Sequence, residues 1–364
     1  MRNYELVTKY IMNKMLRQKF EVRKEIFYVQ MNVTDICTED CKHCYLKEKR
    51  KSFFCDEMNA LDLINVLRKT FDYVQRNSRK LVVDLIGGDP LAKPDIYTII
   101  EYLYENKIEY GIKGNPDLLF DNIVQLVKMN IKHYQMSLDG LEKNHDWIRS
   151  KGSFKTTISA IQLLNEYQVP VYIKFTLSDV NSKDLWPLLY ELYERKVKID
   201  SFSVARYFEK GDGGFHTSKE YYDEAYERII AFYRMQIENH DIRIHINLKE
   251  HLWIPYLLKK GHILKECYDL IDGNPYLSSC SILSNKSMVI TCDGYYDICP
   301  KMQNFNRTKK IDDYMEKKNE FISEIIEHSC NECIWKKYCL GCPAFHTDCG
   351  VVKDCDCFLF EKRL

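Results

Sequence analysis

The chain has 364 residues, of which 45% are hydrophobic and 29% are charged, and its 53 basic residues balance 53 acidic residues. This composition excludes a disordered chain. A formal net charge of zero gives no reason to expect nucleic acid or an anionic membrane surface as a partner. No secretory signal is visible and no apolar run reaches the roughly 18 residues of a membrane span, so we expect a cytoplasmic protein.

Short runs rich in β-forming residues alternate with longer amphipathic stretches from residue 26 onward, after a mixed segment over 1–25 in which we expect a helical extension. The expected strands are Ile26–Val33, Leu81–Ile86, Lys107–Ile112, His133–Leu138, Val171–Leu177 and Ile199–Ala205. The expected helices are Asp56–Gln75, Pro94–Glu105, Asp117–Met129, Ser153–Tyr167, Asn181–Glu194 and Ser218–Asn239. This alternation predicts an α/β fold of six parallel βα units, a partial or full TIM-like barrel with its site at the C-terminal strand ends.

The pattern changes near residue 240, where helical periodicity fades and cysteines become frequent. We therefore predict a core barrel over 26–240 and a cysteine-rich domain over 241–364. The Asp293-Gly294 pair, flanked by β-forming residues in Ser287–Ile298, predicts a small β-hairpin in the second domain.

Fifteen cysteines are unevenly placed, with four between residues 37 and 55, none over 56–266, and eleven from Cys267 to Cys357. A reducing cytosol disfavours a disulfide framework, so metal or cluster binding is the default interpretation.

Three of the cysteines, Cys37, Cys41 and Cys44, follow the first expected strand with the spacing C-x3-C-x2-C. Three thiolates in one loop can ligate three irons of a 4Fe–4S cluster and leave the fourth iron open, as catalytic metal sites require. The alternative is a zinc site with His43 as fourth ligand. It is disfavoured because His43 lies between two of the cysteines and would chelate the same ion awkwardly.

This motif resembles that of the radical S-adenosylmethionine (SAM) superfamily, and the resemblance extends along the chain. Gly87-Gly88-Asp89-Pro90 ends the second expected strand and looks like the Gly-Gly-Glu-Pro motif of that superfamily. Ser137-Leu138-Asp139-Gly140 ends the fourth, and Arg149 follows it. The resemblance implies that the open iron binds SAM, and the implied SAM contacts are His43, Gly87, Gly88, Asp89, Ser137 and Arg149.

The C-terminal cysteines resemble the SPASM domain, which carries auxiliary 4Fe–4S clusters. The residues that carry this likeness are Cys280, Gly294-x4-Cys299, Cys330-x2-Cys333-x5-Cys339-x2-Cys342, and Cys349, Cys355 and Cys357. The resemblance implies a first auxiliary cluster on Cys280, Cys299 and Cys342, with Cys267, Cys292 or an open iron completing it. It implies a second on Cys330, Cys333, Cys339 and Cys357, which we prefer to Cys355 because a short aromatic tail follows it. Cys349 is the weakest candidate, and Cys55 is expected to be a buried thiol. The quartet from Cys330 to Cys342, taken alone, also fits a zinc ribbon.

The resemblance implies reductive cleavage of SAM to a 5′-deoxyadenosyl radical that abstracts hydrogen from a substrate. SPASM proteins mostly modify ribosomally made peptides or proteins, so we predict a peptide maturase that forms a thioether or carbon–carbon crosslink. The alternatives are oxidation of Cys or Ser to formylglycine, as in sulfatase maturases, and a small-molecule dehydrogenase or decarboxylase. A zinc-binding module without catalysis is the alternative of another class.

One residue type distinguishes the peptide reactions. Sulfatase maturases place an Asp directly after the cysteine of G-x4-C, where it acts as a base, but Cys299 is followed by Pro300, which cannot transfer a proton. Asp297 is the candidate base that keeps this alternative open. The expected partners are a peptide or protein substrate and an electron donor such as flavodoxin or ferredoxin. About 25 residues precede the first strand, too few for a leader-binding domain, so a leader peptide would need a separate binding protein or be read by the barrel itself.

Overall fold

The computed structural model describes residues 26–46, 57–207, 215–216, 218–247, 252–262, 283, 286–302, 307–328, 330–346, 357 and 359. The expected helical extension over 1–25 lies outside these residues. So do five of the cysteines discussed above, namely Cys55, Cys267, Cys280, Cys349 and Cys355.

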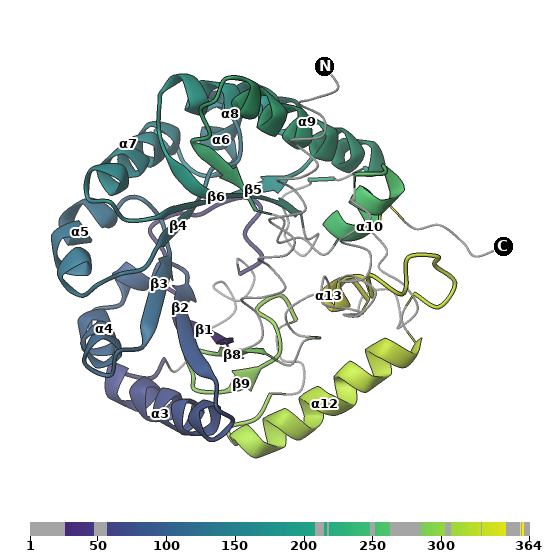
Figure 1. Ribbon diagram of the computed structural model, residues 1–364. Coiled ribbons are helices and arrows are strands. Elements are labelled where there is room, and N and C mark those ends of the chain that lie inside the picture. The colour runs from purple at the N-terminus through teal and green to yellow at the C-terminus, as the bar shows by residue number, and fades with distance from the viewer. Residues whose placement is uncertain are drawn as a thin grey trace.

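A single curved sheet organises the described residues (Figure 1). Its strands are β1 (Ile26–Thr34), β2 (Lys80–Gly87), β3 (Glu109–Lys113), β4 (Tyr134–Ser137), β5 (Val171–Leu177), β6 (Ile199–Arg206), β7 (Ile244–Ile246), β8 (Ser287–Ile290) and β9 (Tyr296–Asp297). Their order across the sheet is β7-β6-β5-β4-β3-β2-β1-β8-β9. Neighbouring strands are parallel except for the β8–β9 pair, which is antiparallel. The predicted partial TIM-like α/β fold is thus confirmed.

Helices cover the outside of this sheet, as each βα unit requires (Figure 1). They are α3 (Ala60–Arg76), α4 (Ile96–Glu105), α5 (Leu119–Lys128), α6 (Glu142–Ile148), α7 (Ser153–Glu166), α8 (Leu185–Glu194) and α9 (Lys219–Glu238), with the short helices η1 (Pro90–Ala92) and η2 (Ser182–Asp184). The C-terminal helices α10 (Trp253–Lys259), α12 (Ile311–His328) and α13 (Pro343–His346) lie toward the open side, between the two ends of the sheet (Figure 1).

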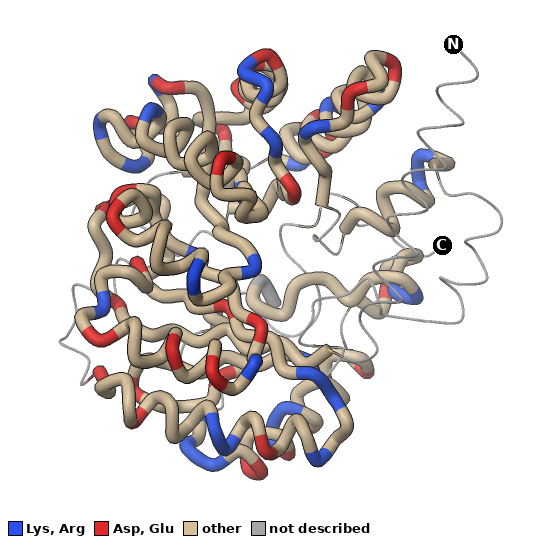
Figure 2. Tube along the Cα trace, turned by 60° about the vertical axis from the view of Figure 1, so that its left-hand side comes forward, with Lys and Arg blue, Asp and Glu red and all other residues tan. Residues whose placement is uncertain are grey.

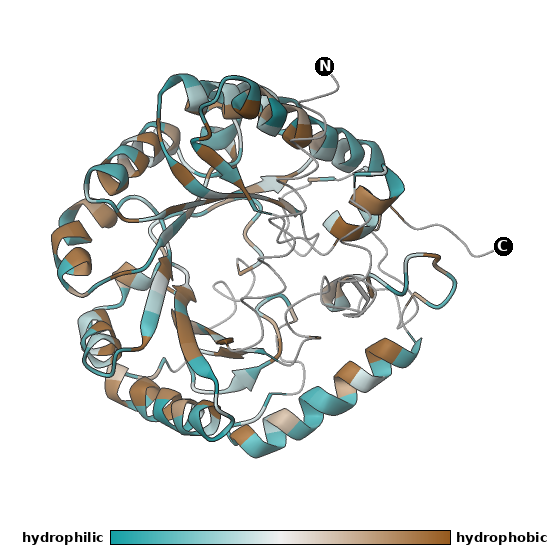
Figure 3. Cartoon of the chain, in the orientation of Figure 1, coloured by the Kyte–Doolittle hydropathy of each residue, from teal (hydrophilic) through white to brown (hydrophobic). Residues whose placement is uncertain are grey.

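The outer helices carry both hydrophobic and hydrophilic residues (Figure 3), and basic and acidic residues are interspersed along them (Figure 2). Among the described residues, no helix combines the length and the apolar character that crossing a membrane requires.

Strand alternation divides the core from the barrel interior. In β5, Val171, Ile173, Phe175 and Leu177 are buried in the hydrophobic core, and the residues between them are only half-buried. Because successive side chains of a strand point to opposite faces, the intervening Lys174 and Thr176 face the inside of the barrel. Polar side chains at the inward positions can therefore gather at the C-terminal strand ends.

The expected hairpin forms where Asp293-Gly294 predicted it, with Val289 opposite Asp297 and Ile290 opposite Tyr296. The sheet continues beyond the expected boundary at residue 240, because β7 pairs with β6 and the hairpin strand β8 pairs with β1. The division into 26–240 and 241–364 stays a prediction.

Six of the described outer helices end on a non-glycine residue with positive φ: Ser78, Lys107, Asn130, Gln168, Lys196 and His240. After five of them, the next amide donates to a carbonyl five residues back, and in three of these five the donor is apolar: Ile108 donates to Leu103, Ile131 to Leu126 and Val169 to Leu164. This bond closes the helix and directs an apolar residue toward the core. It also explains why the strand expected to begin at Lys107 begins instead at Glu109.

Left-handed backbone at these exposed positions predicts that glycine would stabilise the fold. We expect Gln168→Gly to raise the free energy of unfolding by about 0.5–1 kcal/mol, because glycine lacks the Cβ that disfavours positive φ. Urea denaturation followed by circular dichroism measures it. The control is Glu101→Gly, at an exposed position inside α4, which should lower the same quantity by about 1 kcal/mol. Destabilisation by both changes would contradict the prediction.

A charged cluster lies inside the barrel beneath the strand ends. Asp84 of β2 lies 2.7 Å from Nζ of Lys113 on β3, and 3.1 Å from Nε2 of His133. The His133 ring stacks on Tyr172 of β5 with centroids 4.3 Å apart. Burial by itself would raise the pKa of Asp84, but Lys113 and His133 outweigh it and hold that pKa well below its usual range.

This depressed pKa makes part of the stability dependent on pH. The contribution of ionised Asp84 should be fully present above the unfolded pKa of about 4 and should be lost as the pH falls below it. We expect Asp84→Asn to cost about 3 kcal/mol at pH 7, as loss of a buried ion-pair partner does. The difference in free energy of unfolding between variant and wild type, measured by urea denaturation, should decrease as the pH falls from 5 to 3. Asp72→Asn, on the exposed face of α3, is the control. A gap that does not change with pH would refute the assignment.

Candidate functional site

One cavity at the C-terminal ends of the strands collects residues from distant parts of the sequence. Cys37, Cys41 and Cys44 line it together, from the loop after β1. Five of the six residues implied to contact SAM also line it, namely His43, Gly87, Gly88, Ser137 and Arg149. The structure therefore brings together the motifs after β1, β2 and β4, as expected for the carboxyl edge of a parallel sheet.

The two glycines at the end of β2 allow the cysteine loop to pass close by. The amide of Gly88 donates to the carbonyl of Thr34 at 2.8 Å, and the amide of Asp89 donates to the carbonyl of Ile36 at 2.7 Å. A Cβ on Gly87 would lie 2.1 Å from the Thr34 oxygen, and one on Gly88 would lie 2.0 Å from the Ile36 oxygen. Any side chain at either position would displace the loop that carries the three cysteines.

Asp89 is the implied SAM contact that does not line this cavity. It is fully buried, and its Oδ1 accepts a hydrogen bond from the amide of Leu91 at 3.1 Å, which caps η1. Its other oxygen, Oδ2, has no hydrogen-bond partner among the described residues. Burial raises the pKa of Asp89 to about 6. The geometry gives this residue a role in shaping the turn, and its contact with SAM stays a prediction.

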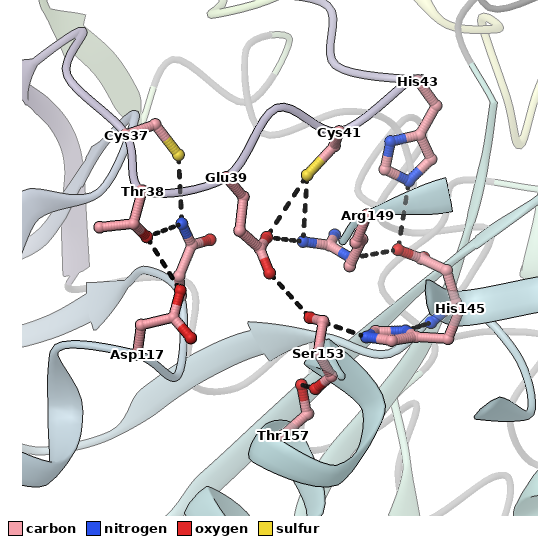
Figure 4. A network of polar contacts seen from close by, with 12 residues as sticks. Cys37, Thr38, Glu39, Cys41, His43, Asp117, His145, Arg149, Ser153 and Thr157 are labelled. Atoms are coloured by element: carbon pink, nitrogen blue, oxygen red, sulfur yellow. Dashed lines mark hydrogen bonds and ion pairs between the residues drawn. The ribbon is translucent and has the colours of Figure 1, made fainter. Parts of the chain in front are cut away.

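Arg149 holds the cysteine loop against the end of β4 (Figure 4). Its Nη1 donates to Oε2 of Glu39 at 2.9 Å, and its Nε donates to Oδ2 of Asp139 at 2.8 Å. Burial opposes the charge on both carboxyls, yet Arg149 outweighs it and lowers the pKa of Glu39 and of Asp139. One guanidinium between two carboxylates therefore links residues 110 positions apart in the sequence.

A chain of hydrogen bonds continues from Glu39 to Ser153 of α7 and His145 of α6 (Figure 4). Burial lowers the pKa of His145 to about 4, so its ring is neutral at pH 7. Its Nδ1 accepts from the amide of Asp139 at 3.0 Å, which leaves the proton on Nε2, 3.2 Å from Oγ of Ser153. The Ser153 hydroxyl then donates to Oε1 of Glu39 at 2.8 Å. Each group in this chain has a definite donor or acceptor role, which makes the network rigid.

The surroundings of the three sulfurs suit an iron–sulfur cluster. Asn115 Nδ2 donates to Sγ of Cys37 at 3.1 Å, and Nη1 of Arg149 lies 3.6 Å from Sγ of Cys41. Hydrogen bonds to sulfur are one way in which proteins tune such clusters. Burial raises the pKa of the Cys41 thiol, so ligation there must displace a proton, and Arg149 is placed to compensate the thiolate.

The contacts of His43 do not favour a role as a fourth metal ligand. Its Nε2 lies 3.1 Å from Oδ2 of Asp139, and its other ring nitrogen, Nδ1, is buried without a hydrogen-bond partner in the described part of the chain. The imidazole is therefore engaged with the same carboxylate that holds Arg149, which argues against the zinc alternative.

The described C-terminal cysteines fall into separate groups. Cys330, Cys333, Cys339 and Cys357 line one small cavity, together with Trp335 and Leu359. This is the set that the sequence predicts for the second auxiliary cluster, including the choice of Cys357, and its ligation stays a prediction.

The first auxiliary cluster is described only in part, because Cys280 and Cys267 lie outside the described residues. Burial and the neighbouring Cys342 raise the pKa of Cys299 to about 11, so these two thiols lie near each other. Cys292 lies elsewhere: its Sγ is 3.5 Å from Oδ2 of Asp35, at the base of the cysteine loop. Of the two predicted fourth ligands, Cys292 therefore already has a carboxylate neighbour.

Asp297, the candidate base, lines a neighbouring cavity with Cys299, Pro300 and Arg307. It is not among the residues that line the cavity of Cys37, Cys41 and Cys44. The residue after Pro300 does reach that cavity, since Lys301 forms part of its wall.

The sequence analysis missed several residues of the cavity wall: Lys113, Asn115, Gln135, Lys174, Thr176, Arg206, Tyr207 and Lys301. Some of them carried a readable signal. Gln135 and Ser137, like Lys174 and Thr176, are alternate polar residues at the end of an otherwise apolar strand. This pattern marks an inward face at the site end of the barrel.

Comparison with known proteins agrees with this geometry. The model of the radical SAM superfamily matches residues 31–189. The AdoMet-dependent heme synthase of Methanosarcina barkeri is 25% identical over 215 residues, which cover 58% of this chain and 59% of the relative. The chain spans between 54% and 62% of the length of the first three curated relatives.

Two solved structures share the fold. Streptococcus suis SuiB bound to its precursor peptide SuiA superposes with a TM-score of 0.65 at 18% identity, covering 87% of this chain and 72% of SuiB. The structure of anSMEcpe with bound AdoMet and Kp18Cys peptide gives a TM-score of 0.65 at 17% identity, with 92% of each chain covered. The part of the chain that matches the radical SAM superfamily, residues 31–189, thus contains the three cysteines and the Gly87-Gly88 strand end that line one cavity.

Proposed function

We propose that this chain is a radical SAM enzyme that modifies a ribosomally made peptide. The observation that carries the proposal is the single cavity lined by Cys37, Cys41 and Cys44 and by the Gly87-Gly88 strand end. Support for a peptide substrate comes from the fold, because SuiB and anSMEcpe, which share it, were solved with bound peptides.

The residues of the cavity would have different roles in such an enzyme. A 4Fe–4S cluster and SAM, when bound, supply the 5′-deoxyadenosyl radical chemistry of the superfamily, and the protein supplies position and electrostatics. Cys37, Cys41 and Cys44 would hold the cluster. Arg149 orients the loop through Glu39 and donates toward Cys41, while Asn115 donates to Cys37. Gly87 and Gly88 let the loop lie close to β2, and the open side of the cavity admits the substrate.

A crosslink is the reaction that we favour. Formylglycine formation requires a base beside the reacting residue, and the candidate Asp297 lines the neighbouring cavity. No carboxylate is found in the described wall of the cavity that holds the three cysteines. A thioether or carbon–carbon bond, like formylglycine, is a two-electron oxidation, so an electron acceptor must take the second electron after hydrogen abstraction. The cavity of Cys330, Cys333, Cys339 and Cys357 is the proposed place of one such acceptor, an auxiliary cluster. The electron donor, of the flavodoxin or ferredoxin class, and a separate leader-binding protein remain part of this proposal.

Replacing the three N-terminal cysteines should abolish SAM cleavage. After anaerobic iron–sulfur reconstitution, we expect wild type to form 5′-deoxyadenosine from SAM under dithionite, and Cys37/Cys41/Cys44→Ala to form none. The control is Cys333→Ala, in the separate C-terminal cavity, which should lower the iron content but keep the cleavage. Zinc in place of iron, without the broad absorption at about 400 nm of such clusters, would refute the enzyme assignment.

The product distinguishes the candidate reactions. With a cysteine-containing peptide that the enzyme accepts, we expect a product lighter by two hydrogens, and one alkylatable thiol fewer if the bond is a thioether. Mass spectrometry with and without iodoacetamide measures both. An aldehyde that reacts with a hydrazide probe would indicate formylglycine and would contradict crosslinking. Repeating the assay with Asp297→Asn tests the base, because only formylglycine formation should depend on it.

A further inference from the structure

A second group of cysteines lines a cavity that shares no described residue with the cavity of the N-terminal cysteines. The segment after α12 and the start of α10 form most of its wall, and the rest comes from near the C-terminus. The described lining residues are Leu252, Pro255, Cys330, Cys333, Trp335, Cys339, Gly341, Cys357 and Leu359. Only the four sulfurs and the indole of Trp335 are polar groups on these side chains. We call this cavity the four-cysteine site.

Closed turns hold the backbone around these cysteines. The amide of Cys333 donates to the carbonyl of Cys330 at 2.9 Å, and the amide of Cys339 donates to the carbonyl of Trp335 at 3.0 Å. Gly341 has a φ of 71°, a left-handed conformation that favours glycine, and its amide donates to Sγ of Cys339 at 3.3 Å. One sulfur of the site therefore has a hydrogen-bond donor of the kind that helps to set the potential of iron–sulfur clusters.

The indole nitrogen of Trp335 is a donor that lacks an acceptor. Its Nε1 is buried, and no hydrogen-bond partner for it is found among the described residues. Buried tryptophan N–H groups usually have a partner, and a buried donor left without one costs about 1–3 kcal/mol. Because the residue lines the four-cysteine site, the sulfur of a group bound there would supply the missing acceptor.

The donor set fits an iron–sulfur cluster. Four thiolates complete the ligands of a 4Fe–4S cluster, and three of the four cysteines are buried. Reduction of such a cluster adds a negative charge, which the apolar wall of Leu252, Pro255 and Leu359 disfavours. An N–H group that donates to sulfur has the opposite effect, because it stabilises the more negative state.

We propose that Nε1 of Trp335 donates a hydrogen bond to a sulfur of a cluster held by the four-cysteine site, and that this bond raises the reduction potential of the cluster. The inference rests on the proposed function and names a residue that adjusts its electron acceptor. In that function the substrate radical loses one electron and one proton as the new bond forms. The electron is taken up at this site and passes to an oxidised carrier protein of the flavodoxin or ferredoxin class.

The test isolates this site in the full chain. In Cys37/Cys41/Cys44/Cys299/Cys342→Ala, the N-terminal cluster and the first auxiliary cluster lack their ligands, so anaerobic reconstitution loads the four-cysteine site alone. We expect about four iron atoms per chain. Electron paramagnetic resonance during a redox titration then measures the midpoint potential of this background protein.

Removing the indole N–H should make the cluster harder to reduce. In this background we expect Trp335→Phe to keep the iron content and to lower the ratio of reduced to oxidised cluster about tenfold at a fixed potential, a midpoint lower by about 59 mV for one electron. Trp335→His retains a ring N–H and should recover part of this shift. The matched control is Trp253→Phe, because Trp253 also has a buried indole nitrogen without a partner in the described part of the chain but is not among the lining residues.

A spectroscopic measurement does not depend on these variants. With isotopically labelled tryptophan, pulsed electron paramagnetic resonance of the reduced background protein should detect coupling to one indole nitrogen. Absence of this coupling would overturn the proposal even if Trp335→Phe failed to assemble a cluster. An unchanged midpoint in Trp335→Phe, or an equal shift in Trp253→Phe, would overturn it as well.

Failure of this inference can be distinguished from failure of the proposed function. Zinc in place of iron at the four-cysteine site would overturn the inference, while 5′-deoxyadenosine formation by the unaltered chain would leave the radical SAM function standing. Absence of that cleavage would refute the proposed function. A lower midpoint in Trp335→Phe would then still assign the hydrogen bond to Trp335.

Discussion

The contact on which the site depends is that of Arg149 with Glu39 and Asp139. The cysteine loop follows β1, and Arg149 follows α6, so the chain itself does not hold them together. The buried guanidinium of Arg149 holds them together by pairing with both carboxylates. Breaking these ion pairs would leave charged groups buried and unpaired. Because Nη1 of Arg149 also faces Sγ of Cys41, the same interaction positions the loop and sets the electrostatic surroundings of a sulfur.

A second constraint acts from the other side of the loop. Gly87 and Gly88 allow the carbonyls of Thr34 and Ile36 to approach the end of β2 more closely than any side chain would permit. The loop is therefore held between a backbone contact to β2 and an ionic contact to the end of β4. Both contacts leave the cysteines facing the cavity, where a cluster and a cosubstrate can reach them.

The alternation of side chains along the strands accounts for a polar cavity next to an apolar core. Outward residues of each strand pack under the helices, so the inward positions are available to polar side chains. The cluster of Asp84, Lys113 and His133 shows that some of this interior charge is balanced within the barrel. Basic residues nearer the strand ends, among them Lys174 and Lys301, line the cavity of the three cysteines.

Much of this arrangement followed from the sequence alone. Alternating β-rich and amphipathic segments predicted the parallel barrel, and the spacing of Cys37, Cys41 and Cys44 predicted a cluster loop after β1, because local propensity and chain spacing determine both. Tertiary structure decided the rest. Four features depend on how distant elements pack. They are the pairing of β8 with β1, the placement of Asp297 in a neighbouring cavity, the turn-shaping position of Asp89, and the convergence of Lys174, Arg206 and Lys301 on one cavity. Periodicity shows which face of an element is buried, but it does not show which side chains of other elements pack against that face. The charge of the cavity depends on which side chains this packing brings together.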